Sequence, residues 1–389
     1  MPDSKNSKNY KLISAIIILG VAGSYVGILS LVNMFAGSFG LVHLLNSKNI
    51  LKNHRTELIE KIERDPHFAD INIDQYVKEM EKIITMDKKR HLGEWISFRS
   101  FTPNISGTYI NTNDYGMRSK WNLKEMVQRA KKNQNEGIKN IIILGGSVAF
   151  GYGATSDKKT ISSFLDDMLK EDGYEVFNLA QGGYTSYMDL FSLSTMGLYL
   201  EPNIIIVIEG YADTLQLAYE SKGGDLAWGL FSGSDKNLEP EFAFGFHYQN
   251  LITILGLGKN LERQAILALQ PLSGFENNST IENEKIKKMW ALYPRIREIM
   301  KLAAKKNNAQ FLDLSVIFKE DIDSNINFFD KAHLTVTGQK KVANALAKTV
   351  KNLETKKQKY INFLQLREKS IKDILDKNFL GEYKTVEDY

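Results

Sequence analysis

The sequence predicts an α/β fold in which helices flank a doubly wound, mostly parallel β-sheet. Short apolar runs such as NIIILGG and NIIIVIEG alternate with helical segments between residues 138 and 352. Continuous runs of Ile, Val and Leu are typical of strands buried on both faces, as in a parallel sheet. The chain has 389 residues, of which 43% are hydrophobic, enough for a large core. It has no cysteine, which excludes a disulfide scaffold, and its net charge of +4 does not indicate a nucleic-acid partner.

The predicted strands and helices follow one another in a regular order. The strands are expected, in chain order, in the runs NIIILGG, YEVFNLA, NIIIVIEG, QAILALQP and AQFLDLS. The helices are expected in ISSFLDDMLK, MDLFSLSTMGL, ALYPRIREIMKLAAKK and GQKKVANALAKTVKNL. Parallel strands require crossover connections, which are usually helices, so this alternation fits a parallel sheet.

One apolar segment near the N-terminus differs from the rest of the chain. Residues 1–11 are a short polar tail, and residues 12–46 contain no Asp, Glu, Lys or Arg. A helix needs about 20 apolar residues to cross a membrane, so the segment predicts one transmembrane helix. It is longer than the roughly 7 to 15 apolar residues of a signal peptide. Basic residues stand on both sides of it and leave the orientation open; we expect a single-pass anchor with the domain outside the cytoplasm.

Polar segments flank the predicted sheet domain of residues 138–352. Residues 47–90 are charged, with apolar residues at helical spacing, and predict a helical stalk or linker. Residues 91–137 are rich in aromatic residues, Thr, Asn and Gly, which predicts a lead-in of short strands and turns. Residues 219–260 show no clear period and are expected to form an insertion near the strand ends. Residues 353–389 predict a charged amphipathic helix that packs back on the domain or binds a protein partner.

The residues that follow the apolar runs are the candidates for chemistry, because ligands of open α/β sheets bind at the carboxyl ends of the strands. Ser147 follows the first run within GGSVAFGYG. A serine in such a strand-to-helix turn is exposed beside its own backbone N–H and is a candidate nucleophile. The loop has neither the Lys-Ser/Thr of a P-loop nor the dinucleotide-binding glycine spacing. Near the C-terminus, Asp330 and His333 are three residues apart, a spacing that lets the carboxylate orient the imidazole.

These segments resemble the sequence blocks of the SGNH/GDSL-type serine esterase and acyltransferase family, in its membrane-anchored bacterial form. The matching residues are Gly146-Ser147, the Gly183 turn after Asn178, and Asp330-x-x-His333, and an upstream N-x-x-G-x-R segment lies within residues 111–118. The resemblance covers roughly residues 105 to 350. It implies a flavodoxin-like three-layer fold, with Ser147 as nucleophile, His333 as general base and Asp330 as its partner. It also implies an oxyanion hole formed by the N–H groups of Ser147 and Gly183, and no metal or organic cofactor.

One position departs from the family pattern. The third block is usually Gly-x-Asn-Asp, whose Asn amide is an oxyanion donor, but here Ala212 stands in its place. Loss of one such donor typically costs about 100- to 1,000-fold in rate. The resemblance therefore implies a serine hydrolase for acyl esters, an esterase or O-acyltransferase, with cell-envelope carbohydrate among its possible substrates. The alternative is a catalytically impaired, membrane-tethered binding or scaffold protein with the same fold.

Several residues near the predicted site admit more than one role. Tyr184, Glu209 and Tyr211 are candidates for lining the substrate pocket, although the tyrosines fit the core equally and Glu209 also fits a hydrogen-bonded structural carboxylate. Asp213 is expected to cap the helix that follows it. Arg118 either recognises an anionic group or forms a structural ion pair. The other histidines lack metal-ligand spacing, and we expect them to have packing or surface roles.

Overall fold

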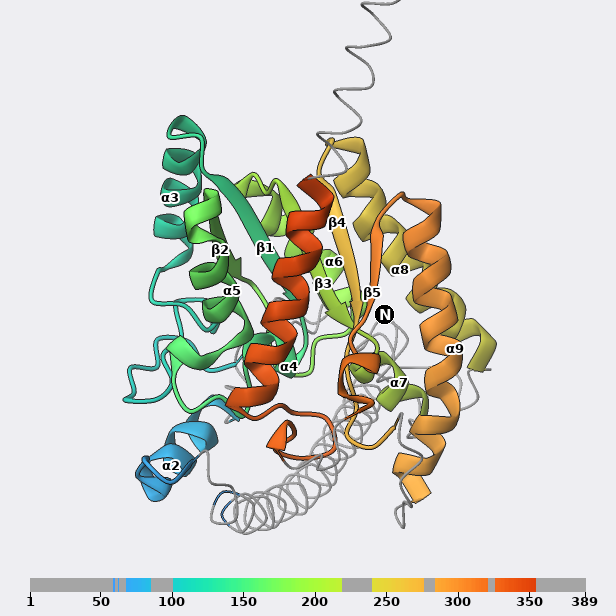
Figure 1. Ribbon diagram of the computed structural model, residues 1–389, viewed down its shortest axis with the longest axis horizontal. Coiled ribbons are helices and arrows are strands. Elements are labelled where there is room, and N and C mark those ends of the chain that lie inside the picture. The colour runs from blue at the N-terminus through green and yellow to red at the C-terminus, as the bar shows by residue number, and fades with distance from the viewer. Residues whose placement is uncertain are drawn as a thin grey trace, which may run out of the picture. The chain divides into compact units, whose positions relative to one another are not determined.

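The computed structural model describes residues 59, 62, 68–84, 101–218, 240–275, 284–320 and 326–354. Its centre is a sheet of five parallel strands in the order β2-β1-β3-β4-β5 (Figure 1). The strands are β1 (Lys139–Gly145), β2 (Tyr174–Asn178), β3 (Ile204–Glu209), β4 (Gln264–Leu269) and β5 (Gln310–Asp313). Four of them lie within their predicted apolar runs, and β1 begins one residue before its run, which confirms the predicted parallel sheet.

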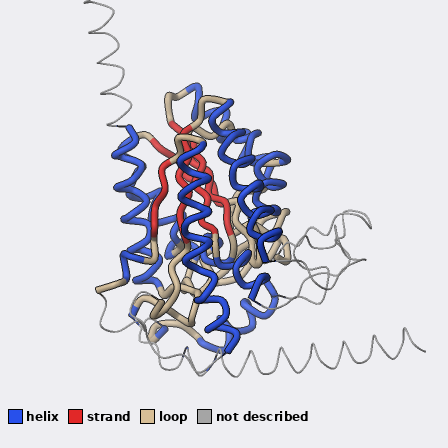
Figure 2. Tube along the Cα trace, turned by 90° about the vertical axis from the view of Figure 1, so that its right-hand side faces the viewer, coloured by secondary structure: helices blue, strands red, loops and turns tan. Residues whose placement is uncertain are grey.

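Helices cover both faces of this sheet (Figures 1 and 2). The α-helices are α2 (Ile73–Ile84), α3 (Leu123–Asn135), α4 (Ser147–Phe150), α5 (Ile161–Leu169), α6 (Ser186–Thr195), α7 (Tyr211–Ala218), α8 (Pro240–Asn260) and α9 (Glu284–Lys306). A last helix begins at residue 336 and continues to the end of the described range at 354. Short 3-10 helices are η2 (Asp157–Lys159), η3 (Lys170–Asp172), η4 (Gly197–Leu200) and η5 (Val316–Phe318).

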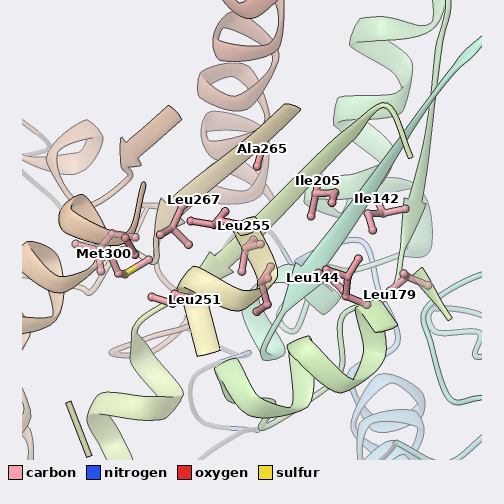
Figure 3. Packing of buried hydrophobic residues seen from close by; sticks show 14 of the residues in the cluster. Ile142, Leu144, Leu179, Ile205, Leu251, Leu255, Ala265, Leu267 and Met300 are labelled. Carbon is pink, nitrogen blue, oxygen red and sulfur yellow. The ribbon is translucent and has the colours of Figure 1, made fainter. Parts of the chain in front are cut away.

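The core lies between the sheet and the helices α3, α6, α8 and α9 (Figure 3). Because side chains alternate along a strand, Ile142 and Leu144 of β1 enter this cluster, whereas Ile141 and Ile143 point to the opposite face. All four are fully buried. Burial on both faces explains why the strand sequences are continuously apolar instead of alternating.

Two predicted segments contain more helix than expected. The second half of the lead-in forms α3, which begins with a capping box in which Asn122 and Glu125 each bond the other's backbone N–H. Residues 101–120 contain only an isolated bridge between Ser106 and Asn111 instead of paired strands. The predicted insertion of residues 219–260 contains α8. This helix contacts α6, α9 and β4, and packing on several sides explains why its sequence shows no single apolar stripe.

The lead-in is fixed by close contacts against the edge of the sheet at which the strands end. The Phe101 N–H donates to Gln181 Oε1 at 3.1 Å, and Gln181 Nε2 donates to the Tyr115 carbonyl at 2.8 Å. Gly182 lies directly against the Phe101 ring, since a Cβ added at Gly182 would come within 1.7 Å of Phe101 Cζ. Phe101 and Tyr115, which lie upstream of the sheet, therefore hold Gln181 and Gly182, the two residues before Gly183.

Arg118 anchors the lead-in as a buried ion pair, which is the structural role among the two predicted for it. Its Nε donates to Asp157 Oδ1 at 2.7 Å, and its Nη1 and Nη2 donate to the carbonyls of Gly151 (2.6 Å) and Tyr109 (3.0 Å). The Arg118 side chain is only 1% exposed. No anion is needed to explain its position.

Arg118→Met should lower the free energy of unfolding by about 3 kcal/mol, because it removes the cation and leaves the two carbonyls without their donor. Urea unfolding of the purified protein, followed by circular dichroism, measures the change. Arg129→Met is the matched control, since the Arg129–Glu175 pair has an arginine side chain that is 45% exposed. Its cost should stay below about 1 kcal/mol. Equal costs in the two variants would contradict the anchoring role of Arg118.

Several predicted segments lie outside the described residues. These are the N-terminal tail 1–11, the predicted anchor 12–46, most of the stalk 47–90 and, beyond residue 354, the C-terminal helix of 353–389. Within the described ranges, no helix has the length and hydrophobicity needed to cross a membrane.

Candidate active site

A serine, a histidine and an aspartate from two distant segments form a continuous hydrogen-bonded chain. Ser147 is the first residue of α4 and follows directly on β1, and its Oγ lies 2.7 Å from His333 Nε2. His333 Nδ1 lies 2.8 Å from Asp330 Oδ2. Asp330 and His333 belong to the loop before the last helix. The structure therefore brings the three predicted catalytic residues together in the order that nucleophilic catalysis requires.

Asp330 is held in place and in its ionised form by the same turn that carries His333. Its Oδ1 accepts hydrogen bonds from the N–H groups of Ala332 and His333, both at 2.8 Å. Burial by itself would raise the pKa of the Asp330 carboxyl. The charge and hydrogen bond of His333, together with the two N–H groups, outweigh burial and lower this pKa well below its usual value. The carboxylate can thus orient the imidazole and stabilise its protonated form.

An aromatic side chain that the sequence pattern does not single out packs against the His333 imidazole. The ring centroids of Tyr152 and His333 are 4.3 Å apart, at an interplanar angle of 39°. The Tyr152 N–H donates to the Ser147 carbonyl at 2.9 Å, so the turn after α4 fixes Tyr152 relative to Ser147. Burial, followed by the charges of Tyr76 and Asp330, raises the pKa of the Tyr152 phenol and keeps it neutral. Tyr152 stands within the Gly151-Tyr152-Gly153 segment that follows α4, but nothing in that pattern indicates a contact with residue 333.

Two backbone N–H groups at the predicted oxyanion hole are unused by turns or loops in the described part of the chain. Neither the Ser147 N–H nor the Gly183 N–H donates such a backbone hydrogen bond. Ser147 begins α4, and the first N–H groups of a helix have no partner within it. Gly183 has φ +75°, in the left-handed region that favours glycine, and a Cβ added there would meet no atom within 4 Å. Because β1 and β2 are adjacent parallel strands, both groups follow carboxyl ends at the same edge of the sheet.

The third block is fixed to the second by a buried network. Ala212 is half-buried in the first turn of α7. The next residue, Asp213, accepts hydrogen bonds from Ser186 N (3.0 Å) and Ser186 Oγ (2.7 Å), and its Oδ1 lies 2.9 Å from His247 Nδ1. Asp213 therefore caps the N-terminus of α6. The sequence predicts instead that it caps α7, the helix that contains it. The segment after Gly183 and the segment of Ala212 are thus held side by side.

The predicted pocket residues lie at this edge but differ in exposure. Tyr184 and Glu209 are 0% and 1% exposed, so a substrate contact would require both to be uncovered. Glu209 Oε2 accepts a hydrogen bond from the Gly210 N–H, which is the structural role among those predicted for it. Tyr211 is half-buried and packs against the large apolar cluster. Its contact with a substrate stays a prediction.

The network around Asp213 predicts acid sensitivity. Burial raises the pKa of the Asp213 carboxyl, but His247 and Ser186 outweigh burial and bring it to about 2. Its stabilising effect is therefore complete above its unfolded pKa of about 4, and is lost as the pH falls towards 2. Asp213→Asn should destabilise the protein by roughly 2 kcal/mol at pH 7 but much less at pH 2.5, as measured by urea unfolding at both values. A cost that does not depend on pH would contradict this assignment.

Comparisons with solved structures find similar folds at low identity. One is an acetyl xylan esterase, AlAXEase, 17% identical, aligned over 54% of this chain and 99% of that one, with a TM-score of 0.41. A putative acylhydrolase from Bacteroides fragilis is 18% identical over 60% of this chain and 99% of that one, with a TM-score of 0.39. A lipase/acylhydrolase from Enterococcus faecalis is 15% identical over 55% and 96%, with a TM-score of 0.39. No protein-family model and no curated protein matches the sequence. At these identities and TM-scores, the side chains of the site must carry the functional assignment.

Proposed function

We propose that this protein is a serine hydrolase that acts on acyl esters through an acyl-enzyme intermediate. The observation that carries the proposal is the hydrogen-bonded chain from Ser147 Oγ through both nitrogens of His333 to the Asp330 carboxylate. A nucleophile, a base and a group that orients the base are the parts that acyl transfer requires.

The first half of the reaction forms the acyl-enzyme. Ser147 Oγ attacks the ester carbonyl carbon while His333 Nε2 takes the hydroxyl proton, and the ionised Asp330 stabilises the resulting imidazolium. The carbonyl oxygen becomes an oxyanion, and the free N–H groups of Ser147 and Gly183 donate to it. When the tetrahedral intermediate collapses, His333 gives its proton to the leaving alcohol. The acyl group is then bound to Ser147 Oγ.

The second half releases the acyl group to an acceptor. Water, or the hydroxyl group of an acceptor molecule, attacks the acyl carbon while His333 Nε2 takes the proton of the attacking hydroxyl. When the bond between the acyl carbon and Ser147 Oγ breaks, His333 gives this proton to Ser147 Oγ. Water as acceptor gives an esterase, and a sugar hydroxyl gives an O-acyltransferase. Acylated carbohydrate of the cell envelope is the substrate class that the sequence resemblance favours.

A fluorophosphonate probe and p-nitrophenyl acetate test the proposal on the purified full-length protein. We expect the probe to label Ser147 and the ester to be hydrolysed, and Ser147→Ala to abolish both. Ser194→Ala is the matched control, because Ser194 is an exposed serine on α6 and its loss should change neither signal. If wild type is unlabelled and its turnover does not exceed that of Ser147→Ala, the binding or scaffold function, which Ala212 favours, replaces the enzyme.

We further propose that residues 12–46 anchor the catalytic domain at the outer side of a membrane. Support comes from the absence of charged residues over a length sufficient for one span. A reporter that is active only outside the cytoplasm, fused after Tyr389, should be active in cells. An inactive reporter, with the fusion intact in the membrane fraction, would contradict the orientation. The charged C-terminal segment 353–389 is the part we propose for a protein partner.

A further inference from the structure

Two buried carboxyl groups, those of Asp189 and Glu209, hold the turns that carry the candidate active site. Asp189 of α6 accepts a hydrogen bond from the Gly145 N–H through Oδ1, at 3.0 Å. Glu209, the last residue of β3, accepts one from the Gly210 N–H through Oε2, at 3.1 Å. Gly145 and Gly210 have φ of +140° and +115°, conformations in which L side chains are strained. Gly145 is two residues before the nucleophile, so each carboxyl fixes one of the glycine turns at the site.

The remaining oxygen atom of each carboxyl, Asp189 Oδ2 and Glu209 Oε1, is completely buried and receives no hydrogen bond from a donor among the described residues. Glu209 follows Ile208, whose strand partner is Gly145, and Gly145 is held by Asp189, so the two carboxyls lie at neighbouring strand ends. They are close enough for a carboxyl–carboxyl hydrogen bond, and Glu209 is also close enough to Asp213 for one. Two carboxylates cannot make such a bond unless one of them carries a proton, and two unscreened negative charges at this distance repel strongly.

The surroundings of the two carboxyls also favour a retained proton. Asp189 is 0% and Glu209 1% exposed. The titratable groups that face them are Asp213 on α7, Tyr184 before α6 and Tyr293 on α9, and His247 on α8 is paired with Asp213. No Lys or Arg of the described residues bonds to either carboxyl. Burial is the largest cause that raises the pKa of both groups. Asp189 and Asp213 raise the pKa of Glu209 further, whereas for Asp189 the charge of Asp213 raises the pKa and the hydrogen bond with Glu209 lowers it.

We propose that Asp189 and Glu209 share one proton and act as a positioning pair that ties the Ser147 turn to the turn after β3. The inference rests on the proposed hydrolase function for its kinetic consequence. With the proton in place, the hydrogen bond between the two side chains joins Asp189, which holds Gly145 at the end of β1, to Glu209 at the end of β3. When the proton is lost, the two carboxylates repel, and Gly145 moves with Asp189. The Ser147 N–H and Oγ then leave the geometry that the transition state requires.

Glu209→Gln separates the hydrogen bond from the shared proton. The glutamine carbonyl can still accept from the Gly210 N–H, and its amide can donate to Asp189 without titrating. We expect its kcat at pH 7 to stay within about threefold of wild type, and we expect activity to fall at alkaline pH less in this variant than in wild type. Asp189→Ala removes the acceptor of the Gly145 N–H, and should lower kcat by about 10- to 100-fold with little change in KM. Ser192→Ala is the matched control, since Ser192 is a buried residue of α6 whose hydroxyl bonds to none of the residues that the structure describes.

Infrared spectroscopy of the full chain tests the shared proton without using activity. The wild-type-minus-Glu209→Gln difference spectrum at pH 7 should contain the carbonyl band of a protonated carboxylic acid, and the Ser192→Ala difference spectrum should not. Absence of that band would overturn the inference even if the protein proves to be no enzyme. Wild-type kcat in a folded Asp189→Ala variant, or equal losses in Glu209→Gln and Glu209→Ala, would overturn the positioning role. If the fluorophosphonate fails to label wild type, the proposed hydrolase function is contradicted, but the shared proton is not.

Discussion

Asp330→Asn should lower kcat for p-nitrophenyl acetate by about 10,000-fold while KM changes little. The amide oxygen can still accept from the N–H groups of Ala332 and His333, so the turn should persist. The amide cannot stabilise a protonated imidazole, however, and an amide N–H facing His333 Nδ1 selects the wrong tautomer. Steady-state kinetics over a range of pH measures the loss, and thermal unfolding checks the fold.

Asp167→Asn is the matched control for this substitution, because Asp167 is an exposed carboxylate on α5. Its kcat should equal that of wild type. If Asp330→Asn retained more than about a tenth of wild-type kcat, Asp330 would have no essential part in orienting or stabilising His333. The carboxylate would then serve only the turn.

Ala212→Asn should increase kcat, by as much as about 100-fold, because it supplies the oxyanion donor that the third block lacks. Position 212 is well placed for it, since the neighbouring Asp213 is locked to Ser186, three residues after Gly183. The gain should also appear in the rate of labelling by a fluorophosphonate, whose phosphonyl oxygen develops negative charge in the same place. KM should change less than kcat, because the added hydrogen bond strengthens as the oxyanion forms.

Ala212→Asp separates this electrostatic effect from side-chain size. Aspartate has nearly the shape of asparagine but donates no hydrogen bond when ionised and repels an oxyanion. It should lower activity below that of wild type. If Asn and Asp had the same effect at this position, the absence of the amide would not be what limits the enzyme.

The sheet could be predicted from the sequence because its signal is local. Ile141, Ile142, Ile143 and Leu144 are consecutive apolar residues, and such a run needs cover on both faces wherever it occurs. The candidate catalytic residues could be predicted because Ser147 follows an apolar run, and because Asp330 and His333 are three residues apart in one segment. Ser147 follows a strand of the parallel sheet as predicted, whereas Asp330 and His333 lie in the loop before the last helix.

The remaining features could not be predicted because they depend on contacts between distant segments. Glu209 stands out in the sequence as a charge that ends an apolar run, but its partner Asp189 is one of many carboxylates until α6 is placed against β1. Tyr152 likewise meets residue 333 only after the last helix docks. The α8 helix was not evident because it contacts helices and the sheet on several sides, which removes the one-sided apolar pattern.

The contact between Phe101 and Gly182 determines where the sheet domain of this chain could be cut for transfer to another protein. The sheet begins at Lys139, which makes that residue an obvious place to cut. A fragment starting there would lose the ring behind Gly182 and both hydrogen-bond partners of the Gln181 amide. The turn that presents Gly183 would then be free to rearrange. A fragment that keeps the candidate active site therefore has to start upstream of Phe101. In a chimaera joined at β1, the loop of residues 181–183 should be poorly ordered.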